Sequence, residues 1–311
     1  MLISFIVPTY NSEKTIEKCI KSINKQKCKK EIIVVDGIST DKTIEILKRF
    51  ELKIYEEKKK GAGPARNFGL KRTKGDYIAF IDSDVVLPIG WIKKCIKKLE
   101  EDKKIAGVGG PGIGIKKKII SECLDALLYG KSHRTNETFV NSLATMNVVY
   151  KKSIIKGIYF DENILIGEDP EFNFNIIKKG YKLLFSRSLK VYHYHPEKLS
   201  ELIKKWYNYG KYYTIPYLRH KEMIGIDFYF RIFYFPALLL IAILSFFIDT
   251  FIYVIFVQFI LLFFVYFIIG ILNCRNRTMI AFPFVHMIKQ LSHMLGIFVS
   301  IFKRSSVYSV K

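Results

Sequence analysis

GDYIAFIDSDVV, residues 75–86, joins a short apolar segment to two aspartates. The five mostly apolar residues 77–81 follow a Gly-Asp turn signal, which is typical of a central parallel strand covered on both faces. Asp82 and Asp84 come at the carboxyl end of that strand, where open α/β sheets bind ligands. Because two carboxylates only two residues apart repel unless a cation lies between them, the stretch predicts a divalent metal site. The alternative is a solvated turn in which an aspartate caps the next helix.

Strand and helix patterns alternate on either side of this stretch. The expected strands are LISFIVP (2–8), EIIVVD (31–36) and KIYEE (53–57), and the expected helices are 12–25, one opened by 39–41, and PARNFGLKRT (64–73). This βαβ rhythm predicts an α/β fold with a mostly parallel, doubly wound sheet. Residues 121–195 are less regular, and we expect them to complete the sheet. The predicted α/β domain covers residues 1–197.

The composition narrows the class of protein. The 311 residues carry a formal net charge of +22, spread along the chain, which favours an anionic surface or ligand, either a membrane or a nucleic acid. The five cysteines are scattered and form no Cys-x-x-Cys pair, so we expect reduced thiols and no disulfide or zinc site. The N-terminal apolar stretch is too short for a signal peptide, and we expect it to form the first strand.

The carboxyl-terminal third has the composition of a membrane-attached segment. Residues 198–227 mix tyrosine and tryptophan with lysine and arginine, as at a membrane–water interface. Residues 228–272 are almost wholly apolar and are broken near the middle by Asp249-Thr250, which predicts a transmembrane helical hairpin. Arginines flank the hairpin at both ends, so we expect a multi-pass cell-membrane protein whose main domain is cytoplasmic. No nucleic-acid-binding module is recognised beside this segment, which excludes nucleic acid as the favoured partner.

The final segment, 273–311, contains a third apolar stretch from Met279 to Phe302. His286, Lys289, Gln290 and His293 interrupt it at helical spacing and would form one polar stripe. If this helix spanned the bilayer, Lys303 and Arg304 would lie outside, against the charge rule. We therefore favour an interfacial helix over a third membrane span.

Four further stretches carry candidate site residues. Pro8, Thr9 and Tyr10 end the first strand, and Asp36 ends the second, on the same sheet edge as Asp82. GAGPARNFG, residues 61–69, is a Gly-rich segment with Arg66, which could face a base or a phosphate, but its spacing matches neither the dinucleotide fingerprint nor the P-loop. Glu168 and Asp169 precede a predicted helix, and VYHYHP, residues 191–196, contains two histidines, His193 and His195.

Each of these residues has a plainer interpretation. Glu168 and Asp169 could interact only with the positive end of the following helix. One of the two histidines could be a core residue, Arg66 could pair with a surface carboxylate, and Asp36 could cap a turn.

Taken in order, these stretches resemble the family 2 glycosyltransferases, over about residues 1–215. The resemblance implies the GT-A fold, which binds nucleotide sugars, and the apolar hairpin is similar to that of membrane-bound, succinoglycan-type members. It implies that Asp82 and Asp84 hold Mn²⁺ or Mg²⁺ on the diphosphate of a UDP- or GDP-sugar, and that Asp36 contacts the base. It further implies that Asp169 is the catalytic base, assisted by Glu168, and that His193 or His195 completes the metal site. Pro8, Thr9, Tyr10, Arg66 and Ser83 are the other expected nucleotide-binding residues.

The chemistry agrees with this resemblance. A metal can neutralise the charge that develops on the leaving phosphate, and a sugar hydroxyl needs a positioned carboxylate to take its proton. A single in-line displacement would invert the anomeric centre. Processive members carry Gln-x-x-Arg-Trp, whereas this chain has LIKKW at 202–206, so we expect transfer of a single sugar.

Three functions are compatible with the sequence. The favoured one is an inverting transferase that adds a sugar to a hydroxyl of a lipid-linked glycan. The second is a polyprenyl-phosphate glycosyltransferase, similar to dolichyl-phosphate mannose or glucose synthases, whose ionised acceptor phosphate needs no base. The third is a non-catalytic basic membrane scaffold.

Overall fold

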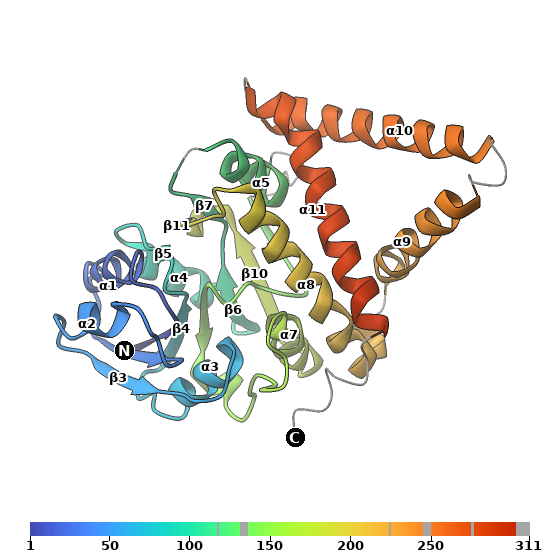
Figure 1. The fold of residues 1–311 in the computed structure, drawn as a ribbon. Helices are drawn as coiled ribbons and strands as arrows, with labels where there is room; N and C mark the ends of the chain where they lie inside the picture. Colours follow the sequence, from blue (N-terminus) through green and yellow to red (C-terminus); the bar gives the residue numbers. More distant parts are fainter. Residues whose placement is uncertain (117, 131–135, 224, 245–249, 275–276, 303–311) are drawn as a thin grey trace. The chain divides into compact units, whose positions relative to one another are not determined.

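The computed structural model describes residues 1–116, 118–130, 136–223, 225–244, 250–274 and 277–302 (Figure 1). The chain forms two compact units. Unit 1 comprises Met1–Ile115 and Thr135–Tyr194, and unit 2 comprises Lys116–Arg134 and His195–Lys311. Unit 2 therefore includes Lys116–Arg134, from the middle of the chain. The predicted domain boundary at residue 197 assigned this segment to the α/β domain.

Unit 1 is built on an eight-stranded sheet. The strand order is β3 (Lys53–Glu56), β2 (Lys30–Asp36), β1 (Ile3–Thr9), β4 (Tyr77–Ile81), β9 (Asn147–Lys151), β6 (Ile105–Gly109), β10 (Lys182–Ser186) and β8 (Glu137–Phe139). The predicted α/β class is confirmed, but the sheet is mixed, because β9 is antiparallel to β4 and β6, and β8 is antiparallel to β10. A buried strand has the same apolar pattern in either direction, so the sequence could not reveal the reversal of β9.

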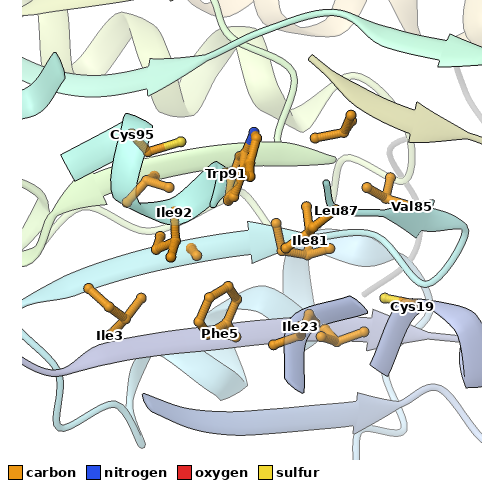
Figure 2. Close-up of a cluster of buried hydrophobic side chains, with 14 of the residues drawn as sticks. Ile3, Phe5, Cys19, Ile23, Ile81, Val85, Leu87, Trp91, Ile92 and Cys95 are labelled. Atoms are coloured by element: carbon orange, nitrogen blue, oxygen red, sulfur yellow. The ribbon is translucent and has the colours of Figure 1, made fainter. Parts of the chain in front are cut away.

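Helices cover both faces of this sheet (Figure 1). On one face, α1 (Ile16–Asn24), α4 (Trp91–Glu100) and the short α2 (Thr43–Leu47) share one apolar cluster with alternate residues of β1, and α4 lies against β6 and β9. Figure 2 shows part of this cluster, with Ile3 and Phe5 of β1 and Ile81 of β4 among its side chains. On the other face, Ile6 of β1 belongs to a second cluster with the short α6 (Lys152–Ile155) and α7 (Glu168–Lys178), and α3 (Ala62–Leu70) packs on β1 and β2.

The strand register places the predicted site residues at one edge. β1 pairs in parallel with β2, with Thr9 opposite Asp36, and with β4, with Ile6 opposite Phe80. The loops after β1, β2 and β4 therefore leave the sheet side by side. A smaller sheet, in the order β5 (Val85–Val86), β11 (Val191–His193) and β7 (Gly112–Gly114), pairs His193 with Val85, the residue that follows Asp84.

Unit 2 is helical. It contains α5 (Ile119–Tyr129), α8 (Leu199–Arg219), α9 (Ile226–Leu244), α10 (Thr250–Asn273) and α11 (Arg277–Phe302), with 3₁₀ turns at Arg187–Leu189 in unit 1 and Lys221–Met223 here. α8 and α11 cross in direct backbone contact, since a Cβ on Gly210 would lie 1.9 Å from the His293 carbonyl oxygen, and one on Gly296 2.1 Å from that of Tyr207. Only glycine fits at this crossing.

The polar stripe predicted on α11 is largely buried within unit 2. His286, Lys289 and His293 are all buried, and the Lys289 Nζ lies 4.0 Å from the centroid of the Trp206 ring on α8. The His286 ring lies 4.0 Å from that of Tyr266 on α10. Because the stripe faces other helices, it does not by itself indicate a helix that lies at a membrane surface.

One stretch of the described residues, Phe256–Asn273 in α10, is long and apolar enough to cross a membrane. Only 6 % of it is buried, unlike the core helix of a globular domain. The break at Asp249 and the charges at Arg275, Lys303 and Arg304 lie outside the described residues. The two-helix hairpin therefore stays a prediction. All five cysteines are free in the structure.

Candidate active site

A pocket of about 590 Å³ opens at the carboxyl edge of the sheet, within unit 1. Its volume is in the range of small-molecule sites. Six predicted residues line it, namely Pro8, Thr9, Tyr10, Asp82, Ser83 and Asp84. Seven further lining residues were not named as candidates, namely Gly37, Ile38, Lys58, Lys60, Gly61, Ala62 and Ala65, although the last three belong to the Gly-rich segment 61–69. Lys58 and Lys60 belong to a lysine run before the Gly-rich segment, and only the fold shows that this run borders the pocket.

The two strand-end aspartates have different neighbours. Asp82 Oδ1 accepts a hydrogen bond from Arg66 Nη2 at 2.8 Å. Asp84 Oδ2 lies 3.2 Å from His193 Nε2, and its carbonyl accepts a hydrogen bond from the backbone amide of Tyr194 at 3.1 Å. The Ser83 hydroxyl lies 2.8 Å from that of Ser12, at the start of the turn before α1. Asp84 and His193 thus form a pair at the pocket wall.

The donor set of this wall fits a hard divalent cation bound together with phosphate. Carboxylate oxygens suit Mg²⁺ and Mn²⁺, and Mg²⁺ is commonly held by one or two carboxylates plus the phosphates of a substrate. Among the residues that the structure describes, no group of three or more His, Cys, Asp or Glu side chains is arranged as a metal cage. Asp82 and Asp84 would therefore supply only part of the coordination of the ion, and the phosphates of the bound substrate would supply the rest.

The two predicted histidines are separated by the fold. His193 is buried on β11 in unit 1, next to Asp84. His195 is buried in unit 2, where its Nε2 lies 2.9 Å from Asp125 Oδ1 on α5. Metal binding by either histidine stays a prediction.

Arg66 is the electrostatic centre of the site. Its side chain is 3 % exposed and bonds to Asp82 through Nη2 and to Glu168 through Nη1. Nη1 also lies 3.7 Å from Asp169 Oδ1. Burial lowers the pKa of the guanidinium, but the three carboxylates together outweigh it, so the net pKa is raised. Arg66 is therefore neither a surface residue nor part of the pocket lining; it joins the strand-end aspartate to the Glu168-Asp169 pair.

Asp169 has the environment of a general base. The backbone amide of Thr145 donates to its Oδ2 at 3.2 Å, and the Thr145 hydroxyl donates to Oδ1. Burial raises the pKa of the Asp169 carboxyl to about 7, and the charge of Glu168 adds to the rise, while Arg66 and Thr145 oppose it. The Asp169 side chain is 26 % exposed, so solvent can reach it. A general base works best with a pKa near the operating pH.

The Asp36 carboxylate caps the turn that follows β2. Asp36 is 3 % exposed, and its carboxylate accepts hydrogen bonds from the Ser39 amide at 2.8 Å and the Ser39 hydroxyl at 2.5 Å. It does not appear in the pocket lining, which is formed there by Gly37 and Ile38. The turn-capping interpretation thus describes its contacts, and a contact with a nucleotide base stays a prediction.

The chain is similar in sequence to known glycosyltransferases. The profile of the family described as "Glycosyl transferase family 2" matches residues 4–156. The chain is 28 % identical over 233 residues to the dolichyl N-acetyl-alpha-D-glucosaminyl phosphate 3-beta-D-2,3-diacetamido-2,3-dideoxy-beta-D-glucuronosyltransferase of Methanococcus voltae. That match covers 67 % of this chain and 71 % of the relative. It is also 27 % identical to the poly(ribitol-phosphate) beta-N-acetylglucosaminyltransferase TarS of Staphylococcus aureus, with 73 % of this chain and 41 % of TarS covered.

Solved structures share the fold. A mannosyltransferase from Pyrobaculum calidifontis, in complex with GDP-Man and Mn²⁺, aligns over 72 % of this chain and 65 % of its own, with a TM-score of 0.56 and 18 % identity. Residues 1–349 of S. aureus TarS, in complex with UDP-GlcNAc, align over 98 % of this chain and 92 % of that one, with a TM-score of 0.52 and 17 % identity. At these identities the likeness supports the GT-A-like α/β fold.

Proposed function

The chain carries a glycosyltransferase family 2 domain, and from this premise we propose that it moves a single sugar from a nucleotide-sugar donor to a hydroxyl of a lipid-linked glycan. The transfer inverts the anomeric centre. The observation that carries the proposal is the position of Arg66, which contacts both Asp82 at the pocket and the Glu168-Asp169 pair. The donor site and a carboxylate with a pKa near neutrality thus lie on either side of one guanidinium.

Each part of the site has a role in the transfer. Lys58 and Lys60 line the donor pocket with positive charge, which suits a diphosphate. Asp82 and Asp84, with His193 beside them, would hold Mn²⁺ or Mg²⁺; when bound, the ion neutralises charge on the leaving diphosphate. Asp169 takes the proton of the acceptor hydroxyl. The hydroxyl oxygen bonds to the anomeric carbon of the donor sugar as the bond between that carbon and the phosphate oxygen breaks. Glu168 stays bound to Arg66 and positions it.

A lipid-linked glycan is the acceptor that the relatives favour. The Methanococcus relative is named for a transfer to a dolichyl-phosphate-linked sugar, and the Staphylococcus relative for a transfer to poly(ribitol-phosphate). Both names describe sugars added to existing glycans or polymers. A polyprenyl phosphate, the alternative acceptor, would have no use for a base at Asp169.

The donor site can be tested by the thermal stability of the whole chain in detergent, with UDP or GDP and with or without Mn²⁺. Binding to the folded state at 100 times Kd adds about 2.7 kcal/mol to the free energy of unfolding. We expect a nucleotide to raise the melting temperature more with Mn²⁺ than without. Asp84→Asn should abolish that metal-dependent increment, because it removes one of the two pocket carboxylates.

Asp102→Asn is the matched control, since Asp102 precedes β6 at the opposite sheet edge and pairs with Lys182. It should keep the increment of the parental protein. An equal response to nucleotide in a chelator and in Mn²⁺ would exclude the metal-assisted donor site.

Membrane attachment through the C-terminal helices is part of the proposal. α10 exposes a row of large apolar side chains, including Phe256, Leu261, Phe264, Ile268 and Leu272. A continuous apolar surface of this kind is covered by lipid or by a partner. We propose that residues 228–272 form the membrane hairpin and that unit 1 lies on the cytoplasmic side.

The whole chain should therefore remain in the membrane pellet after an alkaline carbonate wash. Added protease should remove unit 1 only from vesicles whose cytoplasmic face is outside. Recovery of the whole chain in the supernatant before any wash would contradict membrane attachment.

A further inference from the structure

Ile38 has a backbone conformation that its side chain disfavours. Its φ is 64°, in the left-handed region, where a β-branched residue is an outlier. Among the described residues, Asn11 is the other non-glycine residue with positive φ, and asparagine tolerates this region. Both residues lie in loops at the pocket edge of the sheet. Residues held in such conformations cluster at ligand sites.

Hydrogen bonds on both sides hold the turn that contains Ile38. The Gly37 amide donates to the Thr9 carbonyl at 2.9 Å, and Asp36 accepts two hydrogen bonds from Ser39. The Asn11 amide donates to the Ser39 hydroxyl at 2.9 Å. The surrounding contacts therefore fix Ile38 in its unfavourable conformation, and the strain is not relieved by local rearrangement.

The Ile38 side chain is half-exposed in the pocket wall. Ile38 is 47 % exposed and Tyr10 is 62 % exposed, and both line the pocket. The Tyr10 ring lies beside the intervening Gly37, because a Cβ built there would be 3.7 Å from Tyr10 Cδ2. The loops after β1 and β2 thus present an apolar wall in a pocket that also contains Lys58, Lys60, Asp82 and Asp84. A nucleoside diphosphate combines the matching features, a planar base with apolar faces and charged phosphates.

We propose that Ile38 is a nucleobase-contacting residue, which forms an apolar wall with Tyr10 and packs against the base of the nucleotide donor. This inference rests on the proposed function, because it assumes a nucleotide in the pocket. Ile38 leaves about half of its surface exposed in the free protein while straining the backbone, so contact with a base would bury apolar surface that the free fold leaves open. Glycine at this position would suit the backbone better and would remove the contact.

The test compares Ile38→Gly and Ile38→Asn with the parental chain, all as whole protein in detergent with Mn²⁺. Both replacements tolerate the left-handed conformation, and asparagine keeps a side chain of intermediate size that is polar. The melting temperature without ligand reports the strain, and calorimetric titration with UDP and with GDP gives Kd. Ile89→Gly is the matched control, because Ile89 is 76 % exposed and is not part of the pocket lining.

We expect both Ile38 variants to melt no lower than the parental chain. Their Kd for the nucleotide that the parental chain binds should rise about fivefold to tenfold, equivalent to about 1–1.4 kcal/mol, as an apolar contact is lost. Ile89→Gly should leave Kd unchanged. Parental Kd values in both Ile38 variants would overturn this inference and leave the donor site intact. Absence of nucleotide binding by the parental chain itself would instead overturn the proposed function.

Discussion

Asp169→Asn should slow sugar transfer at least about a hundredfold, because general base catalysis typically contributes about 10²–10⁴-fold in rate. Asparagine keeps the shape of the side chain and can retain a hydrogen bond to Thr145, but it cannot take a proton. Nucleotide affinity should stay close to that of the parental chain, since Asp82, Asp84 and the lysines of the pocket are unchanged. Single-turnover rates and the Kd for nucleotide, measured on the same preparation, separate these two effects.

The pH dependence gives a second measure of the same role. Because the base must be deprotonated and burial raises its pKa to about 7, transfer by the parental chain should decline as the pH falls through 7. Thr145→Val removes a hydroxyl that stabilises the charged carboxylate, so the pKa rises and the decline should begin at a higher pH. Glu168→Gln should have a smaller effect on the rate than Asp169→Asn. If Asp169→Asn transferred sugar at nearly the parental rate, a phosphate acceptor would become the better interpretation.

Arg66→Met should cost both stability and activity. Arg66 is buried and contacts Asp82 and Glu168, with Asp169 nearby, so its loss leaves these carboxylates without their shared cation. Removing one partner of a buried ion pair typically destabilises a protein by about 3–5 kcal/mol. Urea unfolding monitored by fluorescence measures this loss. Transfer should also fail, because both the donor side and the base lose their common partner.

Two variants make this result specific. Arg66→Lys keeps the charge without the planar fork, so its stability should fall between those of the parental and methionine proteins. Arg49→Met removes an exposed arginine paired with Glu45 four residues earlier, a type of pair that contributes about 0.3–0.5 kcal/mol. If Arg66→Met unfolded at the same midpoint urea concentration as the parental protein, Arg66 would not be what holds the site together.

The sequence was most informative where one strand ends in a recognisable pattern. The apolar run before Asp82 predicted a central strand, and β4 confirms it, with Asp82 and Asp84 following at the pocket. This prediction succeeded because the apolar run and the polar residues that end it are adjacent in the sequence. Ile38, Lys58 and Lys60 were missed, because their place in the pocket depends on how separate loops meet. Arg66 was expected to face a ligand or a surface carboxylate. Its partners, 16 and 102 residues away, become neighbours only in the folded sheet.

The histidines show a similar limit. The alternation in VYHYHP suggested two equivalent candidates, but β11 ends at His193, and the regular alternation of the strand ends with it. His193 remains beside Asp84, whereas His195 meets Asp125 on a helix 70 residues earlier in the chain. No local sequence pattern shows that the chain passes from unit 1 to unit 2 between Tyr194 and His195.

The antiparallel strand β9 has a consequence for the order in which the chain can fold. β4 has β1 on one side, and its other side is completed only when Asn147–Lys151 has been synthesised. Until then the apolar strand that leads to Asp82 is an unpaired sheet edge, the kind of surface on which nascent chains aggregate. The segment matched by the family profile ends at residue 156, five residues beyond β9. A ribosome must therefore synthesise the chain as far as Lys151 before this edge of β4 can be covered, so the edge stays unpaired while residues 82–151 are being added.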